Sequence, residues 1–165
     1  MHIGITISLM GEKESLWING IKLNALFLSK TLQKTGHKVT ILDTGKNVKK
    51  ITKDTVQWDL KEFPCEKYGK VQHTVDLMIM LGTSFDTDSI KQWKLMGPNR
   101  KVIKYHCGNN YVIDMERCIF PKKGHRNSGA AAYQRGCMDE VWYVPQQGHQ
   151  NRAYYSVLYD LPLEK

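Results

Sequence analysis

A histidine follows a strand-like run at residues 101–105, and small polar residues come directly after it. Imidazole can donate a hydrogen bond or take a proton near neutral pH, so His106 is a candidate catalytic residue. Gly108 would let the backbone approach a ligand, and Asn109 could orient a hydroxyl group. A buried structural histidine is the alternative reading. Cys107 is disfavoured as a nucleophile paired with His106, because adjacent residues on a strand point to opposite faces.

A loop with glycines at both ends, residues 11–20, follows the strand-like residues 2–9 and precedes a helix. Backbone N–H groups at a helix start attract anions. Gly11, Asn19 and Gly20 are therefore candidate substrate-binding residues, with turn and cap geometry as the alternative. The chain contains neither GxGxxG nor GxxxxGK[ST], which disfavours a dinucleotide or nucleoside triphosphate site of those kinds.

Metal chemistry is not expected from this sequence. Asp86 and Asp88 have the Asp-x-Asp spacing of a divalent-cation site, but two acids at a predicted helix start also suit the helix dipole. We favour capping, and we expect no metal and no cofactor. The four cysteines form no CxxC pair and are expected to be reduced, mostly buried thiols.

The elements that must position these residues alternate between strand and helix. Apolar and β-branched runs predict strands at residues 2–9, 39–42, 75–81, 101–105 and 139–144, with a further short strand at 55–58. Helices are predicted from Asn19 to about Thr35, ended by Gly36, and from Asp86 or Asp88 to Gly97. This alternation predicts an α/β fold, a Rossmann-like parallel sheet with helices on both faces. Ligands of such sheets bind at the carboxyl ends of the strands.

Length and composition favour one globular domain over residues 1–165. Hydrophobic residues make up 41% and charged residues 24%, which argues against disorder. No apolar run approaches the roughly 20 residues of a membrane span. No signal-peptide pattern follows Met1, so a cytoplasmic location is expected.

The net charge of +8 is unevenly distributed. Residues 22–53 carry eight lysines against Asp43 alone, and residues 117–135 carry five basic side chains and no acid. Such patches favour polyanions, an anionic membrane surface or phosphorylated substrates, with a solvated surface as the plain alternative. Because the first patch has few aromatic residues, sequence-specific nucleic-acid binding is not expected.

The ordered segments resemble the start of glycosyltransferases of the GT-B class, which have two Rossmann-like domains facing a cleft. The resemblance rests on Asn19-Gly20 at the helix start and on Gly-His-Lys-Val at 36–39. Residues 105–111 (Tyr-His-Cys-Gly-Asn-Asn-Tyr) and 141–146 (Val-Trp-Tyr-Val-Pro-Gln) are more particular. They are similar to a family of largely uncharacterised bacterial and phage-borne glycosyltransferase-like proteins.

The resemblance implies that the chain is a single GT-B half, the amino-terminal, acceptor-side domain. The carboxyl-terminal domain, which binds the nucleotide sugar, would lie beyond Lys165, so transfer by this chain alone should be slow or absent. The complete enzyme would transfer a sugar to a glycan or lipid-linked acceptor, as in polysaccharide biosynthesis, at the inner membrane face. His106 would hydrogen-bond the donor sugar or steady developing charge. A non-catalytic Rossmann-like structural or binding module, of phage origin, is the alternative.

Overall fold

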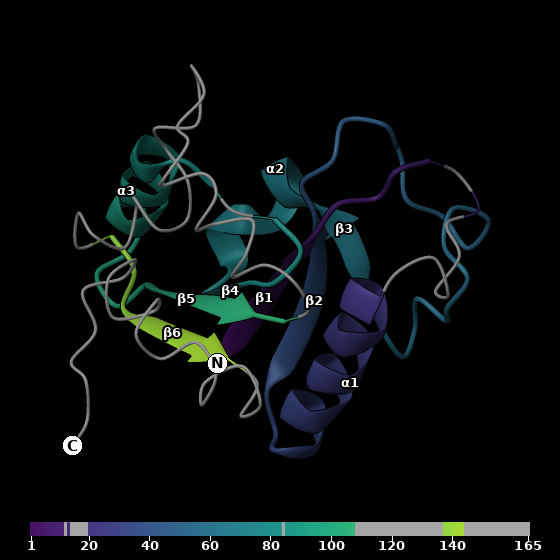
Figure 1. Ribbon diagram of the computed structural model, residues 1–165, viewed down its shortest axis with the longest axis horizontal. Helices are drawn as coiled ribbons and strands as arrows, with labels where there is room; N and C mark the ends of the chain where they lie inside the picture. Colours follow the sequence, from purple (N-terminus) through teal and green to yellow (C-terminus); the bar gives the residue numbers. More distant parts are fainter. Residues whose placement is uncertain (12, 14–19, 84, 108–136, 144–165) are drawn as a thin grey trace.

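In the computed structural model, residues 1–11, 13, 20–83, 85–107 and 137–143 are described. Within these ranges, six parallel strands form one sheet with the order β3-β2-β1-β4-β5-β6 (Figure 1). The strands are β1 (His2–Ile7), β2 (Lys38–Asp43), β3 (Cys65–Lys67), β4 (Leu77–Met80), β5 (Lys101–His106) and β6 (Glu140–Tyr143). From β1 the chain adds β2 and β3 on one side, then returns to add β4, β5 and β6 on the other. This order confirms the predicted Rossmann-like α/β fold.

Helices join the strands. They are α1 (Gly20–Lys34), the short α2 (Tyr68–Val71), the 3₁₀ turn η1 (Gln72–Thr74) and α3 (Thr87–Leu95). None of the helices in the described ranges combines the length and the apolar character needed to cross a membrane.

The central strands are buried on both faces, and each face has its own apolar cluster. Ile79 of β4 packs in a cluster that contains Ala25 of α1. Its neighbours Met78 and Met80 pack in a second cluster that contains Trp93 of α3. Because successive side chains of a strand point to opposite faces, α1 and α3 cover opposite faces of the sheet. Each large apolar side chain buried in this way contributes about 1.5–3 kcal/mol to stability.

The predicted end of α1 and the predicted start of α3 are confirmed, and Asn19, the predicted cap of α1, lies outside the described residues. α1 stops at Lys34, and Gly36 follows with φ of +84°, the left-handed conformation that glycine adopts without strain. Asp86 is the N-cap of α3, since its side chain accepts a hydrogen bond from the backbone N–H of Ser89 at 2.9 Å.

One predicted strand is wrong and one observed strand was not predicted. Residues 55–58 form turns, a single bridge and a bend in place of a strand. The strand beside β2 is β3, in a register that pairs Ile41 with Cys65. β3 is three residues long, and two of these residues are charged. A three-residue edge strand is too short to show the alternation that identifies longer strands.

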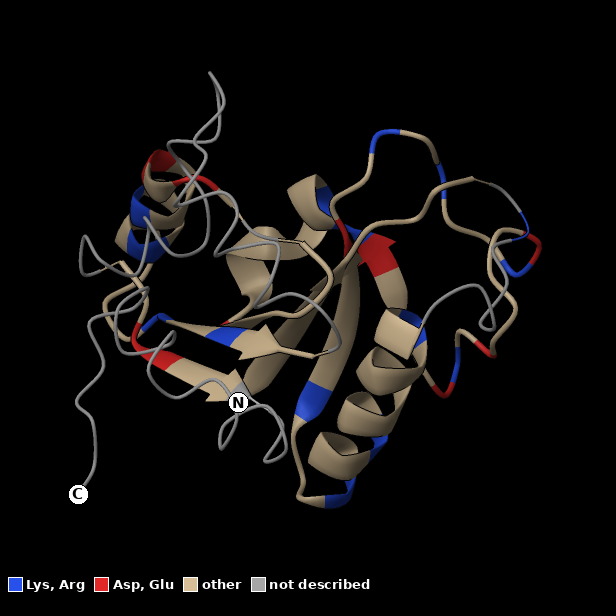
Figure 2. Cartoon of the chain, viewed as in Figure 1, with Lys and Arg blue, Asp and Glu red and all other residues tan. Residues whose placement is uncertain are grey.

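The basic excess of residues 22–53 is spread over several elements. Lysines lie on α1, at the start of β2 and on the loop that follows β2 (Figure 2). Lys46, Lys49, Lys50 and Lys53 of that loop are all exposed. The loop therefore concentrates positive charge near the carboxyl end of β2.

Candidate functional site

The carboxyl ends of the strands, where the sequence predicts chemistry, lie along one edge of the sheet. β1 ends at Ile7 and β4 ends at Met80, and the two strands are adjacent. The chain continues from them toward opposite edges of the sheet, so they mark its topological switch point. Ligands of open α/β sheets bind outside the carboxyl ends of the strands at such a point. We call residues 8–11 and 81–83 the switch-point segments.

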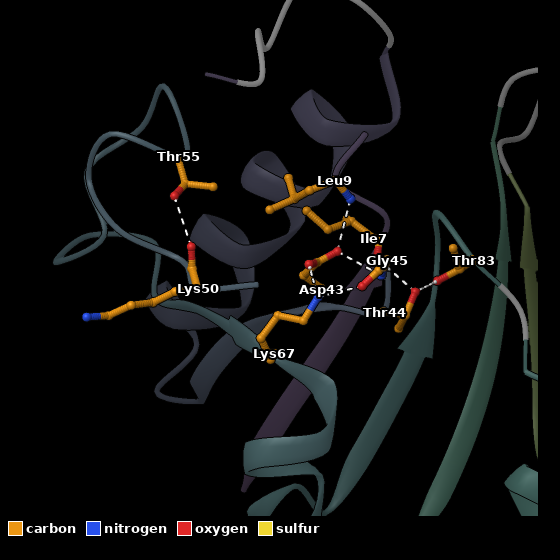
Figure 3. Close-up of polar contacts among 9 residues, drawn as sticks. All are labelled: Ile7, Leu9, Asp43, Thr44, Gly45, Lys50, Thr55, Lys67 and Thr83. Atoms are coloured by element: carbon orange, nitrogen blue, oxygen red, sulfur yellow. Dashed lines mark hydrogen bonds and ion pairs between the residues drawn. The ribbon is translucent and has the colours of Figure 1, made fainter. Parts of the chain in front are cut away.

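Hydroxyl groups tie the strand ends together at this point. The Oγ1 atoms of Thr44 and Thr83 lie 2.8 Å apart, and Thr44 Oγ1 also donates to the Ile7 carbonyl at 3.0 Å (Figure 3). Thr6 Oγ1 donates to the Thr83 carbonyl at 3.0 Å. These bonds join the segments after β2 and β4 across the end of β1, and they hold both segments in fixed positions.

Asp43, the last residue of β2, has a completely buried side chain. Its Oδ1 accepts hydrogen bonds from the backbone N–H of Leu9 at 3.0 Å and of Gly45 at 2.9 Å. Its Oδ2 lies 2.7 Å from Lys67 Nζ (Figure 3). In dinucleotide-binding folds an acid at this place takes the ribose hydroxyl groups. Here the carboxylate is used within the protein, in agreement with the missing glycine fingerprint.

Two further glycines, Gly45 and Gly82, make this edge of the sheet compact. A Cβ at Gly82 would lie 3.0 Å from Ile7 Cα and 3.0 Å from Ile21 Cγ2 of α1. A Cβ at Gly45 would lie 2.8 Å from the Leu9 carbonyl oxygen. Gly45 and Gly82 are crowded because segments far apart in the sequence pack against them, and no local sequence motif predicts this crowding.

The predicted glycines Gly11 and Gly20 have open surroundings. Among the described residues, no atom lies within 4 Å of a Cβ built at Gly11, and only Asn24 Nδ2, at 4.0 Å, comes near one at Gly20. Neither residue has the left-handed backbone that favours glycine. Neither turn strain nor crowding by described residues therefore accounts for these glycines. Both stand at the predicted place, Gly11 beyond β1 and Gly20 as the first residue of α1.

His106 is the last residue of β5 and is completely buried. Burial lowers the pKa of its imidazole to about 3, and the nearby Lys104 acts in the same direction. The ring is therefore neutral at physiological pH. A neutral imidazole has one donor and one acceptor nitrogen, so it can form a directed hydrogen bond but supplies no positive charge.

Cys107 follows β5 and is 3% exposed. Burial raises the pKa of its thiol, and a hydrogen bond with the Asn24 side chain acts against that rise. A protonated, buried thiol is a poor nucleophile. The described cysteines Cys65, Cys107 and Cys137 are all buried and none of them is in a disulfide, as predicted. The Asn24 contact also places the first turns of α1 beside the end of β5.

The structure describes some of the predicted site residues and not others. Gly11, Gly20 and His106 are described, and each adjoins the carboxyl edge of the sheet. Asn19, Gly108 and Asn109 lie outside the described residues. Over the described ranges, no three His, Cys, Asp or Glu side chains are grouped so that they could hold a metal ion.

Strand order, helices on both faces and the switch point define the class: a Rossmann-like α/β protein. A family model described as "Protein of unknown function (DUF2827)" matches residues 3–165, and the chain belongs to that family. No curated protein and no solved structure matches the chain. Its function must therefore be argued from the site.

Proposed function

We propose that this chain is the amino-terminal, acceptor-side half of a GT-B glycosyltransferase. With a donor-binding second half, the enzyme transfers a sugar from a nucleotide sugar to a glycan or lipid-linked acceptor. The observation that carries the proposal is His106, a buried and neutral histidine at the carboxyl end of β5, one strand away from the switch point. By resemblance, this is where retaining members place a histidine near the donor sugar.

The neutral state of His106 suits that role. In a dry site a neutral imidazole forms a stronger hydrogen bond with a sugar hydroxyl than it does in water, and it avoids the cost of burying a charge. No described residue crowds a Cβ built at Gly11 or Gly20, beside the adjoining strand and helix ends. Asn19, Gly108 and Asn109 join the proposed site by resemblance, as residues that bind the acceptor or donor.

The chemistry of the β1 and β2 ends also supports a sugar-transfer half over a dinucleotide enzyme. The chain has no glycine fingerprint, and Asp43 is committed to Leu9, Gly45 and Lys67. A GT-B enzyme holds the nucleotide mainly in its second half, so its first half needs neither feature. The proposal places the protein in the cytoplasm, at the inner face of the membrane, where lipid-linked acceptors are displayed.

A specific observation favours the alternative, a non-catalytic Rossmann-like binding module. The hydroxyl groups nearest the switch point bond to each other, as Thr44 and Thr83 do, and they close part of the edge. The two proposals differ in one measurable respect, because only the enzyme turns over a nucleotide sugar.

The experiment uses the whole product of the natural reading frame and a panel of nucleotide sugars, with binding measured by calorimetry and transfer or hydrolysis by product release. We expect binding and turnover of at least one donor. His106→Ala and the closer match in size His106→Gln should each lower kcat by about 10²-fold. His73→Ala is the control, since His73 is exposed and lies in η1, which precedes β4. Absence of any donor binding would refute the proposal that the protein is a glycosyltransferase. Unchanged turnover in both His106 variants would refute the role of His106 on which the proposal depends.

A further inference from the structure

The loop between β2 and β3 forms a polar pocket of about 510 Å³. This volume is in the range of small-molecule sites. Every lining side chain carries a nitrogen or oxygen atom: Asn47, Lys49, Lys50, Thr52, Asp54 and Thr55. We call this the lysine pocket.

The wall of the lysine pocket is held in place by its own hydrogen bonds. Thr55 is 4% exposed, and its hydroxyl donates to the Lys50 carbonyl at 3.2 Å (Figure 3). The same oxygen accepts from the Thr52 backbone N–H at 3.1 Å. Val48, between two of the pocket residues, and Val56, directly after the last of them, are each 3% exposed and belong to the main apolar cluster. The loop is therefore anchored before any ligand arrives, which lowers the entropy cost of binding.

The cationic groups of the pocket are not used within the described part of the chain. Lys67 and Lys94 pair with Asp43 and Asp139, but Lys49 and Lys50 form no ion pair with any described residue. Figure 3 shows the Lys50 side chain extended away from the Asp43–Lys67 pair. The Asn47 amide likewise forms no hydrogen bond with the described residues. Two ammonium groups and an amide are thus available as donors.

The pocket adjoins the carboxyl edge of the sheet. Asn47 comes two residues after Gly45, a separation of at most roughly 7 Å. Gly45 itself lies against the Leu9 carbonyl of a switch-point segment. The part of a bound molecule that extends out of the lysine pocket would therefore lie at the carboxyl edge of the sheet.

We propose that the lysine pocket binds a phosphate group, as a monoester or diphosphate, carried by the acceptor. Ammonium groups form charge-assisted hydrogen bonds with phosphate oxygens, and these bonds are stronger than neutral ones. Asp54 opposes the anion and tunes the affinity. This inference deepens the proposed function. It rests on the proposed function only in assigning the phosphate to the acceptor.

The pocket is tested by direct binding, without any transfer reaction. The ¹⁵N-labelled chain is titrated with inorganic phosphate and with pyrophosphate at low salt, with chloride at matched ionic strength as the reference. We expect the backbone amides of residues 47–55 to shift with phosphate or pyrophosphate and not with chloride. No shift in that segment, or the same shift with chloride, would overturn the proposal.

Paired variants separate a built pocket from net charge. The double change Lys49→Ala with Lys50→Ala should weaken binding at least tenfold. The matched control is Lys34→Ala with Lys38→Ala, which also removes two exposed positive charges, and Lys38 begins β2 at the opposite edge of the sheet. Asp54→Asn should tighten binding two- to fivefold, a gain that misfolding cannot produce. If the control pair weakened phosphate binding equally, the proposal that the lysine pocket binds phosphate would be overturned.

Two further arms identify the source of the phosphate. Vesicles of phosphatidylcholine containing phosphatidic acid present a lipid phosphomonoester, and vesicles of phosphatidylcholine alone do not. The phosphate is assigned to a lipid if vesicle binding requires phosphatidic acid, requires Lys49 and Lys50, and is stronger than the binding of soluble phosphate. Stronger binding of pyrophosphate, with no response to the vesicles, assigns a soluble phosphorylated acceptor. Either result upholds the lysine pocket whether or not the protein transfers a sugar.

Discussion

Lys67 Nζ lies 2.7 Å from Asp43 Oδ2, with the aspartate side chain completely buried and the lysine side chain 20% exposed. The pair joins the carboxyl ends of β2 and β3, whose backbone ladder is only three residues long. The same carboxylate holds the backbone of Leu9 and Gly45. One buried charge therefore fixes an edge strand, a switch-point segment and the start of the lysine-pocket loop.

Removing this carboxylate should be strongly destabilising. Asp43→Ala leaves two backbone N–H groups and the Lys67 ammonium without their acceptor, and breaking a buried ion pair from one side costs about 3–5 kcal/mol. We expect the midpoint of urea unfolding at neutral pH to fall accordingly. Asp43→Asn should cost less, because an amide oxygen can still accept from the backbone.

The control for this prediction is the exposed pair of Lys30 and Glu62, which are 2.8 Å apart with side chains 54% and 47% exposed. Exposed pairs contribute at most about 1 kcal/mol, so Lys30→Ala should barely move the midpoint. Equal losses in Asp43→Ala and Lys30→Ala would contradict the central place given to Asp43.

The central strands could be predicted from the sequence because they are buried on both faces. β4 is apolar at every position, and β1, β2 and β5 carry β-branched or apolar runs, so local pattern and final environment agree. β3 depends on contacts with β2 and on the Asp43–Lys67 pair, which join residues 24 apart. Such long-range contacts leave no periodic signal, and the prediction consequently fell on residues 55–58.

The site divides in the same way. Strand ends could be located, so His106 and Gly11 were placed at the correct edge of the sheet. Whether a glycine there is required by packing could not be read locally. Gly82 is crowded by Ile7 and Ile21, which lie 75 and 61 residues away in the chain, whereas no described residue crowds Gly11.

Gly82→Ala and Gly11→Ala should therefore have opposite effects on stability. A methyl group at Gly82 would meet backbone at 3.0 Å, and overpacking of this kind costs about 1–3 kcal/mol. At Gly11 the added methyl group meets no described residue and reduces the freedom of the unfolded chain, which changes stability by less than about 1 kcal/mol in the favourable direction. Thermal unfolding of both variants measures the difference. A loss at Gly11 as large as at Gly82 would show that residues 8–11 are packed differently.

Asp86 should stabilise α3 in a pH-dependent way. Hydrogen bonds from the Ser89 backbone and hydroxyl, at 2.9 and 2.8 Å, hold the pKa of the Asp86 carboxyl below its usual value of 3.8. The stabilisation is therefore fully present above about pH 4 and is lost as the pH falls through the lowered pKa. Asp86→Ala should cost about 1 kcal/mol near pH 7 and less at pH 2–3.

Asp88→Ala is the matched control for the cap, because Asp88 lies in the first turn of the same helix and is not the N-cap. Its removal affects only the interaction with the helix dipole, about 0.3–1 kcal/mol. Urea unfolding of both variants at several pH values should show a larger loss for Asp86→Ala above pH 4. Identical curves would argue that Asp86 does not cap α3.

His106 should make the stability of the protein fall as the solution becomes mildly acidic. Its pKa is about 3 in the folded chain against 6.5 for an ordinary histidine, so between these values the unfolded state binds a proton that the folded state does not. The free energy of unfolding must then decrease as the pH falls from about 6.5 toward 3, by at most about 1.4 kcal/mol per pH unit from this one group. The loss is complete only below the folded pKa.

The measurement is confined to about pH 5–7, where carboxylates with ordinary pKa values remain ionised. The pKa of His2 is also lowered, mainly by burial, so His106→Gln should reduce the pH slope without abolishing it. His73→Gln, at an exposed position, should keep the slope of the unaltered protein. The comparison uses slopes and not absolute stabilities, so a packing cost of the glutamine does not confuse it. An unchanged slope in His106→Gln would mean that the pKa of His106 is not lowered in the folded chain, and the argument that burial keeps its ring neutral would then have to be given up.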